Sequence, residues 1–128
     1  TNSVSLALAL ANRGARTIVI GGDVKAGTEA IVGPGALDAL SRYNFSKGFW
    51  GANGVTREQG FTTPDTSEAM VKLESMKHAR ERFVLADASK IGVVTPVTFS
   101  RFEDATLVTC GAVDPDISAL SNVVEVSA

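Results

Sequence analysis

The chain has few of the residues that build covalently linked or metal-held sites. Its 128 residues include one cysteine, Cys110, and one histidine, His78. A single cysteine excludes an internal disulfide, and a lone histidine without cysteine partners excludes the ligand spacing of a zinc site. We therefore expect no metal site, no cofactor and no cysteine or histidine catalysis, and we expect an intracellular protein.

Long apolar runs and clusters of one charge are also missing. The apolar run at residues 4–11 is too short to span a bilayer, and no basic region precedes it. The chain has 12 basic and 14 acidic residues, scattered along its length, with a formal net charge of -2. The short apolar run predicts no membrane segment. The scattered, nearly balanced charges predict no nucleic-acid binding by this chain alone.

What is present suits one globular α/β domain over residues 1–128. The chain is 45% hydrophobic and 20% charged, enough for a single core. Helices are expected at residues 4–12, from Pro34 through Tyr43, and at 66–80 and 117–121. Strands are expected at residues 17–20, 29–32, 45–52, 83–86, 105–110 and 123–126, with 53–64 as a loop and 91–99 irregular or extended. The alternation predicts a three-layer, open, mostly parallel sheet with helices on both faces.

Polar residues open the first helix and follow the third predicted strand. Thr1, Asn2 and Ser3 precede residues 4–12, where free backbone N–H groups and hydroxyls could hold a phosphate, although the motif by itself favours an ordinary helix cap. Gly51 allows a ligand to approach the backbone, and Asn53 both donates and accepts hydrogen bonds. A tight turn that needs positive φ would also favour the glycines here.

Charged residues lie near the same predicted sheet edge. Glu68 and Lys72 are one helical turn apart, so a lysine for phosphate and a carboxylate for sugar hydroxyls share a helix face. The alternative is a surface pair worth about 0.3–0.5 kcal/mol, with Glu68 closing a capping box on Asp65. Lys90 follows the strand at residues 83–86, where open α/β sheets bind ligands, and Asp87 suits a turn cap.

Taken jointly, several motifs resemble the effector domain of DeoR-type transcriptional repressors over about residues 1–126. The matching segments are Thr1-Asn2-Ser3, Gly21-Gly22-Asp23, Val32-Gly33-Pro34, Lys47 through Gly54, Glu68-Ala69 with Lys72, and Asp87-Ala88-Ser89-Lys90. The resemblance implies a sugar-phosphate isomerase or CoA-transferase-like fold and a cytoplasmic homo-oligomer. In such proteins an N-terminal helix-turn-helix domain binds operator DNA, and this domain binds a phosphorylated sugar. It also implies that the chain lacks that DNA-binding domain, the first strand of the effector domain and a Gly/Thr-rich loop.

Three functions remain open at this point. The first is a sensor of fructose- or tagatose-phosphate-like sugars, in which Thr1, Asn2, Ser3, Lys72 and Lys90 contact phosphate at the Gly51 turn while Asn53 and Glu68 read hydroxyls. The second is a sugar-phosphate aldose–ketose isomerase using Glu68 or Asp65, disfavoured because Trp50 and Asn53 stand at aspartate positions of the related isomerases and Lys72 near their catalytic glutamate. The third is an assembly domain contacting another subunit through Phe49 and Trp50. We expect no catalytic residue.

Overall fold

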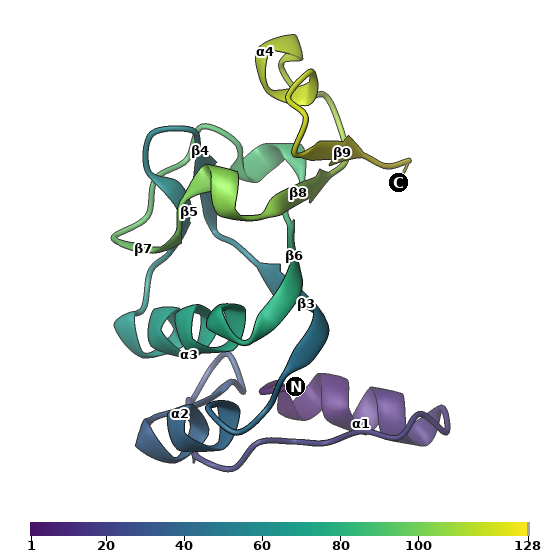
Figure 1. Cartoon of the computed structure of the whole chain (residues 1–128), viewed down its shortest axis with the longest axis vertical. Coiled ribbons are helices and arrows are strands. Elements are labelled where there is room, and N and C mark those ends of the chain that lie inside the picture. Colours follow the sequence, from purple (N-terminus) through teal and green to yellow (C-terminus); the bar gives the residue numbers. More distant parts are fainter. Residues whose placement is uncertain (128) are drawn as a thin grey trace.

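A four-stranded parallel sheet forms the centre of the fold. The computed structural model describes residues 1–127. Strands β3 (Phe45–Gly51), β6 (Ala79–Leu85), β8 (Thr106–Thr109) and β9 (Val123–Glu125) lie side by side in that order (Figure 1). Helices flank the sheet, which agrees with the predicted three-layer α/β fold. The two central strands are buried mainly on one face, since Val84 of β6 and Leu107 of β8 are fully buried whereas Leu85 of β6 is 47% exposed.

A second, antiparallel sheet lies where the sequence suggested a loop. Strands β4 (Gly54–Thr56) and β5 (Gly60–Thr63) form a hairpin, and β7 (Val97–Ser100) pairs with β5 on its other side. The prediction of a loop at residues 53–64 is therefore wrong. Part of the Gly- and Thr-rich segment that suggested a loop is the wholly buried strand β5. Thr62 and Thr63 can be buried there because their hydroxyls have hydrogen-bond partners.

The helices confirm the order of elements and correct several boundaries. Helix α1 (Val4–Asn12) has the predicted ends, with Ser3 accepting the N–H of Leu6. Helix α2 (Pro34–Leu40) is followed by β3, and a short hairpin of β1 (Asp23–Val24) and β2 (Ile31–Val32) precedes it. Helix α3 (Thr66–Lys77) is shorter than predicted because β6 already begins at Ala79. The single-turn elements are η1 (Ala88–Lys90), η2 (Phe102–Asp104) and α4 (Pro115–Ser118).

Helix α3 joins two apolar clusters. One of its sides packs Ala69 and Met76 into the main core with Phe61 and Leu107. Its other side places Val71 in a second cluster with residues of β2 and α2, including Ile31, Val32, Ala36 and Leu40. In Figure 1, α3 accordingly lies between the antiparallel sheet and α2. Within residues 1–127 no helix is long and apolar enough to cross a membrane.

The predicted strand at residues 17–20 is not formed. These residues are extended but belong to no sheet, and Ile18 and Val19 are 49% and 45% exposed. Only Ile20 is buried, in the second apolar cluster. A β-branched run adopts strand structure only beside a pairing partner, and none of residues 1–127 forms a strand beside it.

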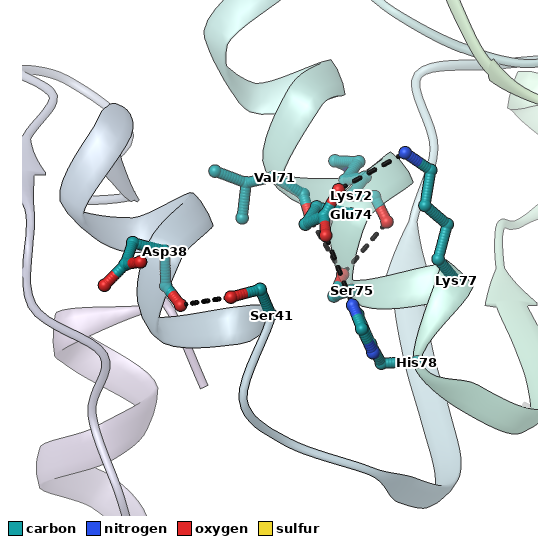
Figure 2. A network of polar contacts seen from close by, with 8 residues as sticks. All are labelled: Asp38, Ser41, Val71, Lys72, Glu74, Ser75, Lys77 and His78. Carbon is teal, nitrogen blue, oxygen red and sulfur yellow. Dashed lines mark hydrogen bonds and ion pairs between the residues drawn. The ribbon is translucent and has the colours of Figure 1, made fainter.

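The C-terminal half of α3 carries a polar network that sequence alone did not indicate (Figure 2). The Ser75 hydroxyl donates to the backbone carbonyls of Val71 and Lys72 and accepts the indole N–H of Trp50 at 2.9 Å. The His78 side chain is half-buried, with Nε2 3.2 Å from a Glu74 oxygen. Through Ser75, α3 fixes the side chain of Trp50 on β3.

We expect Ser75→Ala to lower the free energy of unfolding by about 1–2 kcal/mol, because the partly buried indole N–H of Trp50 loses its acceptor. Ser41→Ala is the matched control, since within residues 1–127 the exposed Ser41 hydroxyl donates only to the carbonyl of Asp38. That variant should stay within about 0.5 kcal/mol of the unmodified chain. Urea denaturation measures both, and equal losses in the two variants would contradict the assigned role of Ser75.

Candidate functional site

The carboxyl ends of three parallel strands meet at a hollow. Strand β3 ends at Gly51, β6 at Leu85 and β8 at Thr109, and the hollow beside them has a volume of about 330 Å³. Its polar lining comes from Asp87, Lys90, Thr109 and Cys110, next to Ala52. The Thr109 hydroxyl is buried and has no hydrogen-bond partner within residues 1–127. Ligands of open α/β sheets bind at this end of the strands.

Asp87 shapes the segment that carries Lys90. It is the N-cap of η1, and its Oδ1 accepts the Ser89 N–H at 2.8 Å and also the Ser89 hydroxyl. These hydrogen bonds, then the nearby charge of Lys90, lower the pKa of the Asp87 carboxyl. The predicted capping role of Asp87 is confirmed, and Asp87 and Lys90 both line the hollow.

Lys72 lies at the junction between α3 and the end of β3. Its Nζ donates to the Gly51 carbonyl at 2.5 Å and lies 5.0 Å from the centre of the Phe99 ring. Burial lowers the pKa of Lys72, and the charge of Glu68 opposes that shift only partly. An ammonium offers three donors, and Gly51 takes one of them. A desolvated cation of this kind favours an anionic ligand.

The start of α3 holds a charged cluster that includes a residue the sequence did not single out. Asp65 caps the helix by accepting the Glu68 N–H at 2.9 Å. Lys25 Nζ lies 3.0 Å from a carboxylate oxygen of Asp65 and 3.0 Å from one of Glu68. Hydrogen bonds to Glu68 and Asp65 raise the pKa of Lys25, whereas the Glu68 N–H and then Lys25 lower the pKa of Asp65. Only the three-dimensional structure places Lys25, 43 residues away in sequence, beside Glu68.

This cluster corrects the predicted surface pair of Glu68 and Lys72. Within residues 1–127 the two side chains form no ion pair, because Lys25 takes the Glu68 carboxylate and Gly51 takes the Lys72 ammonium. The capping box is half formed: Asp65 accepts the Glu68 N–H, but the Glu68 side chain turns to Lys25. Both residues point toward groups outside their own helix.

Asn53 connects the Gly51 loop, residues 51–54, to the end of β5. Its Oδ1 accepts the Thr63 hydroxyl at 3.2 Å, and its backbone N–H donates to the Thr62 carbonyl at 2.9 Å. Positive φ does not explain the glycines of this loop, since neither Gly51 nor Gly54 adopts it. Gly54 is instead required by close approach, because an added Cβ would lie 2.4 Å from the Val93 carbonyl oxygen, whereas nothing lies within 4 Å at Gly51.

Thr1, Asn2 and Ser3 are placed apart from the other predicted residues. Ser3 caps α1, and Asn2 Nδ2 donates to the Ile31 carbonyl at 3.2 Å. Thr1 and Asn2 line a different groove along β3, with Trp50 and Ser75. Hydrogen bonds thus join Gly51 to Lys72, Asn53 to Thr63 and Glu68 to Lys25, while Lys90 and Ala52 share the hollow.

Comparison with known sequences decides the family. The sequence model of the DeoR C-terminal sensor domain matches residues 1–111, well over half of the chain. The chain belongs to the DeoR sensor-domain family. The resemblance seen in the sequence motifs is therefore confirmed, and this DeoR sensor domain contains the Gly51 loop, the start of α3 and the Asp87-to-Lys90 segment within the matched region.

The relatives of this DeoR sensor domain are transcriptional regulators. It is 43% identical over 112 residues to the uncharacterized HTH-type transcriptional regulator FruR of Bacillus subtilis, covering 88% of this chain and 45% of FruR. It is 36% identical over 117 residues to the HTH-type transcriptional regulator GlpR of Haloferax volcanii, covering 91% and 46% respectively. It is 36% identical over 77 residues to a lactose phosphotransferase system repressor of Staphylococcus epidermidis, covering 60% and 30%. The chain spans less than half the length of these curated relatives.

Proposed function

We propose that this DeoR sensor domain binds a phosphorylated sugar between the Gly51 loop, the start of α3 and Lys90. The observation that carries the proposal is Lys72, whose ammonium is desolvated while the Gly51 carbonyl takes one of its three donors. An anion that approaches this ammonium replaces the water that burial removed. Lys90, beside Ala52 of the same loop, supplies a second positive charge.

The other groups suit the sugar rather than the phosphate. Asn53 is exposed and keeps its amide N–H₂ for a hydroxyl acceptor, and Glu68 offers a carboxylate that Lys25 already orients. Thr1 and Asn2 line a separate groove along β3 and Ser3 caps α1, so we do not include these three residues in the proposed ligand site. A fructose- or tagatose-phosphate-like ligand agrees with this mixture, and one relative is named a lactose phosphotransferase system repressor.

In the full-length protein, the sugar phosphate would change operator binding. A ligand shifts an equilibrium between two arrangements only by its difference in affinity for them. We place the two arrangements in a cytoplasmic homo-oligomer that binds operator DNA through a helix-turn-helix domain outside this chain. The HTH-type regulators among the relatives support this arrangement.

An aldose–ketose isomerase is the alternative, and the charge arrangement argues against it. A base that shuttles a proton near neutral pH needs a carboxylate with a raised pKa. The pKa of Asp65 is lowered because its carboxylate accepts the backbone N–H of Glu68 and a hydrogen bond from Lys25. The same lysine forms an ion pair with the Glu68 carboxylate. We therefore infer binding without turnover. Conversion of pentose or hexose phosphates by the purified full-length protein would support the enzyme instead.

A thermal-shift panel on the full-length protein tests the binding proposal. Ligand at ten times its dissociation constant adds about 1.4 kcal/mol to stability, which raises the unfolding temperature by about 3–5 °C. We expect this shift with one or more ketose phosphates and none with the same sugars lacking phosphate at equal concentration. Inorganic phosphate controls for anion binding alone. A panel in which no sugar phosphate stabilises the folded protein would contradict the proposal.

A further inference from the structure

Lys25 links two segments that are far apart in the sequence. It follows strand β1, and its backbone N–H donates to the Ala30 carbonyl at 2.8 Å within the β1–β2 hairpin. Its Nζ reaches the start of α3, where it lies 3.0 Å from a carboxylate oxygen of Asp65 and 3.0 Å from one of Glu68. The hairpin therefore fixes the backbone of Lys25, while its ammonium stands between two carboxylates of α3.

The two carboxylates depend on Lys25 to different degrees. Asp65 caps α3 by accepting the Glu68 N–H at 2.9 Å, so its carboxylate has a second partner. The Glu68 carboxylate forms an ion pair only with Lys25 among residues 1–127. The Glu68 side chain is 17% exposed, so water replaces a lost ion pair only in part. Without Lys25, the Glu68 carboxylate would therefore turn to another cation.

Lys72 is the cation that lies nearest to Glu68 along α3. The two residues are four positions apart, a spacing at which a glutamate that precedes a lysine forms a favourable pair. Burial lowers the pKa of Lys72, and the charge of Glu68 raises it in part, so the two side chains already interact. In the described part of the chain, the other groups at the Lys72 ammonium are uncharged: the Gly51 carbonyl of β3 and the Phe99 ring of β7. A Glu68 side chain released from Lys25 would meet no other charge at that ammonium.

We propose that Lys25 is a positioning residue of the ligand site, which holds Glu68 away from Lys72 and so leaves the Lys72 ammonium available to a phosphate. This inference rests on the proposed function, because it concerns the cation to which we assign the phosphate. A carboxylate and a phosphate compete for one ammonium, and a carboxylate on the same helix has a high effective concentration. Lys25 removes that competitor and keeps the Glu68 carboxylate in position for sugar hydroxyls.

The hairpin itself does not depend on the Lys25 side chain for its position. Ile31 and Val32 of β2 are buried in the second apolar cluster together with Val71 of α3. The Lys25 side chain is 31% exposed, and ion pairs that water reaches contribute little to stability. We therefore expect Lys25→Met to fold, so that its effects report on the position of Glu68. Lys25→Gln, which loses the charge but keeps a hydrogen-bond donor, is a second variant in which the same changes should be smaller.

A measurement without ligand tests the position of Glu68. NMR titration of the lysine Cε signals in the full-length protein follows the pKa of Lys72. Lys25→Met should raise that pKa because the Glu68 carboxylate approaches the ammonium, and the rise should disappear in the Glu68→Gln background. Lys77→Met removes the same charge from the Glu74 pair on α3 and should leave the pKa of Lys72 unchanged. A pKa of Lys72 that does not respond to Lys25→Met, or a rise that persists in the Glu68→Gln background, would overturn the proposal.

Isothermal titration with the sugar phosphate that gives the largest thermal shift tests the effect on binding. Affinity should fall about tenfold in Lys25→Met and be close to normal in Lys25→Arg, which keeps the cation. Glu68→Gln should lower the affinity of the unmodified protein but raise that of Lys25→Met, because there it removes the competing carboxylate. A purely structural role of Lys25 would not reverse the sign of the Glu68→Gln effect.

The two measurements also separate this inference from the proposed function. If the unmodified protein binds a sugar phosphate and Lys25→Met binds it equally well, the role of Lys25 is refuted while the proposed function stands. If no sugar phosphate binds the unmodified protein, the proposed function is refuted, and the assignment of Lys25 to a ligand site falls with it. A raised pKa of Lys72 in Lys25→Met would then still show that Lys25 keeps Glu68 and Lys72 apart.

Discussion

In the full-length protein, Lys72→Met is expected to weaken binding of a phosphorylated sugar by about 100-fold, or about 2.7 kcal/mol. Losing a partly buried charge that faces a phosphate dianion removes more affinity than losing an exposed one, because water screens it less. Methionine keeps the length and apolar stem that cover Phe99. Isothermal titration of the purified variant with the sugar phosphate that gives the largest thermal shift measures the change.

The fold should tolerate the same substitution. The Lys72 ammonium is desolvated, and replacing a buried charge by an apolar group of similar size is often neutral. We expect the free energy of unfolding to change by less than about 1 kcal/mol. Lys77→Met is the matched control on α3, since Lys77 is largely exposed and, in the part of the chain that the structure describes, pairs only with Glu74. If the Lys72→Met and Lys77→Met proteins bound the sugar phosphate with equal affinity, Lys72 would not be part of the ligand site.

The pH dependence of binding gives an independent readout of Lys72. Burial lowers its pKa, so its ammonium loses a proton at a lower pH than an ordinary lysine as the solution becomes alkaline. A sugar phosphate remains doubly ionised in that range because its second pKa is near 6. Affinity should therefore fall with rising pH through the folded pKa of Lys72, and Lys72→Met should abolish that fall. A decline of the same size in the variant would assign the titration to another group.

The parallel sheet could be predicted from the sequence, whereas the antiparallel sheet could not. The apolar, partly β-branched runs before Asp87 and Cys110 have strand propensity and lie in β6 and β8, where Val84 and Leu107 are fully buried. Thr62 and Thr63 are as deeply buried, but their burial depends on hydroxyl partners at Thr95 and Asn53. Such partners come from distant segments, so composition alone suggested a loop.

The candidate site shows the same division. The Gly51 loop and Lys90 were identified because they follow predicted strands, and Lys72 because it lies one helical turn after Glu68. Lys25 was missed because its contacts with Asp65 and Glu68 depend on how the β1 hairpin packs near α3. The strand expected at residues 17–20 failed for the opposite reason: its sequence has strand propensity, but pairing needs a neighbour that residues 1–127 do not supply.

Gly54→Ala is expected to destabilise the fold by about 3 kcal/mol, the largest effect on stability that we predict. The added Cβ would lie 2.4 Å from the Val93 carbonyl oxygen and 2.6 Å from Thr62 Oγ1. Backbone cannot move away cheaply, and Thr62 Oγ1 also accepts the N–H and hydroxyl of Thr95. The clash therefore separates β5 from the segment that follows Lys90. Urea denaturation of the variant measures the loss.

Gly51→Ala is the matched control and should separate folding from binding. No atom lies within 4 Å of an added Cβ at Gly51 and its φ is not positive, so the free energy of unfolding should change by less than about 1 kcal/mol. The new methyl group stands beside the carbonyl that orients Lys72, where the proposed ligand approaches the backbone. We expect sugar-phosphate affinity to fall at least about tenfold, by a clash of roughly 1.4 kcal/mol. Unchanged affinity in a stable Gly51→Ala protein would mean that the ligand does not approach Gly51, and Lys72 would then need another anionic partner.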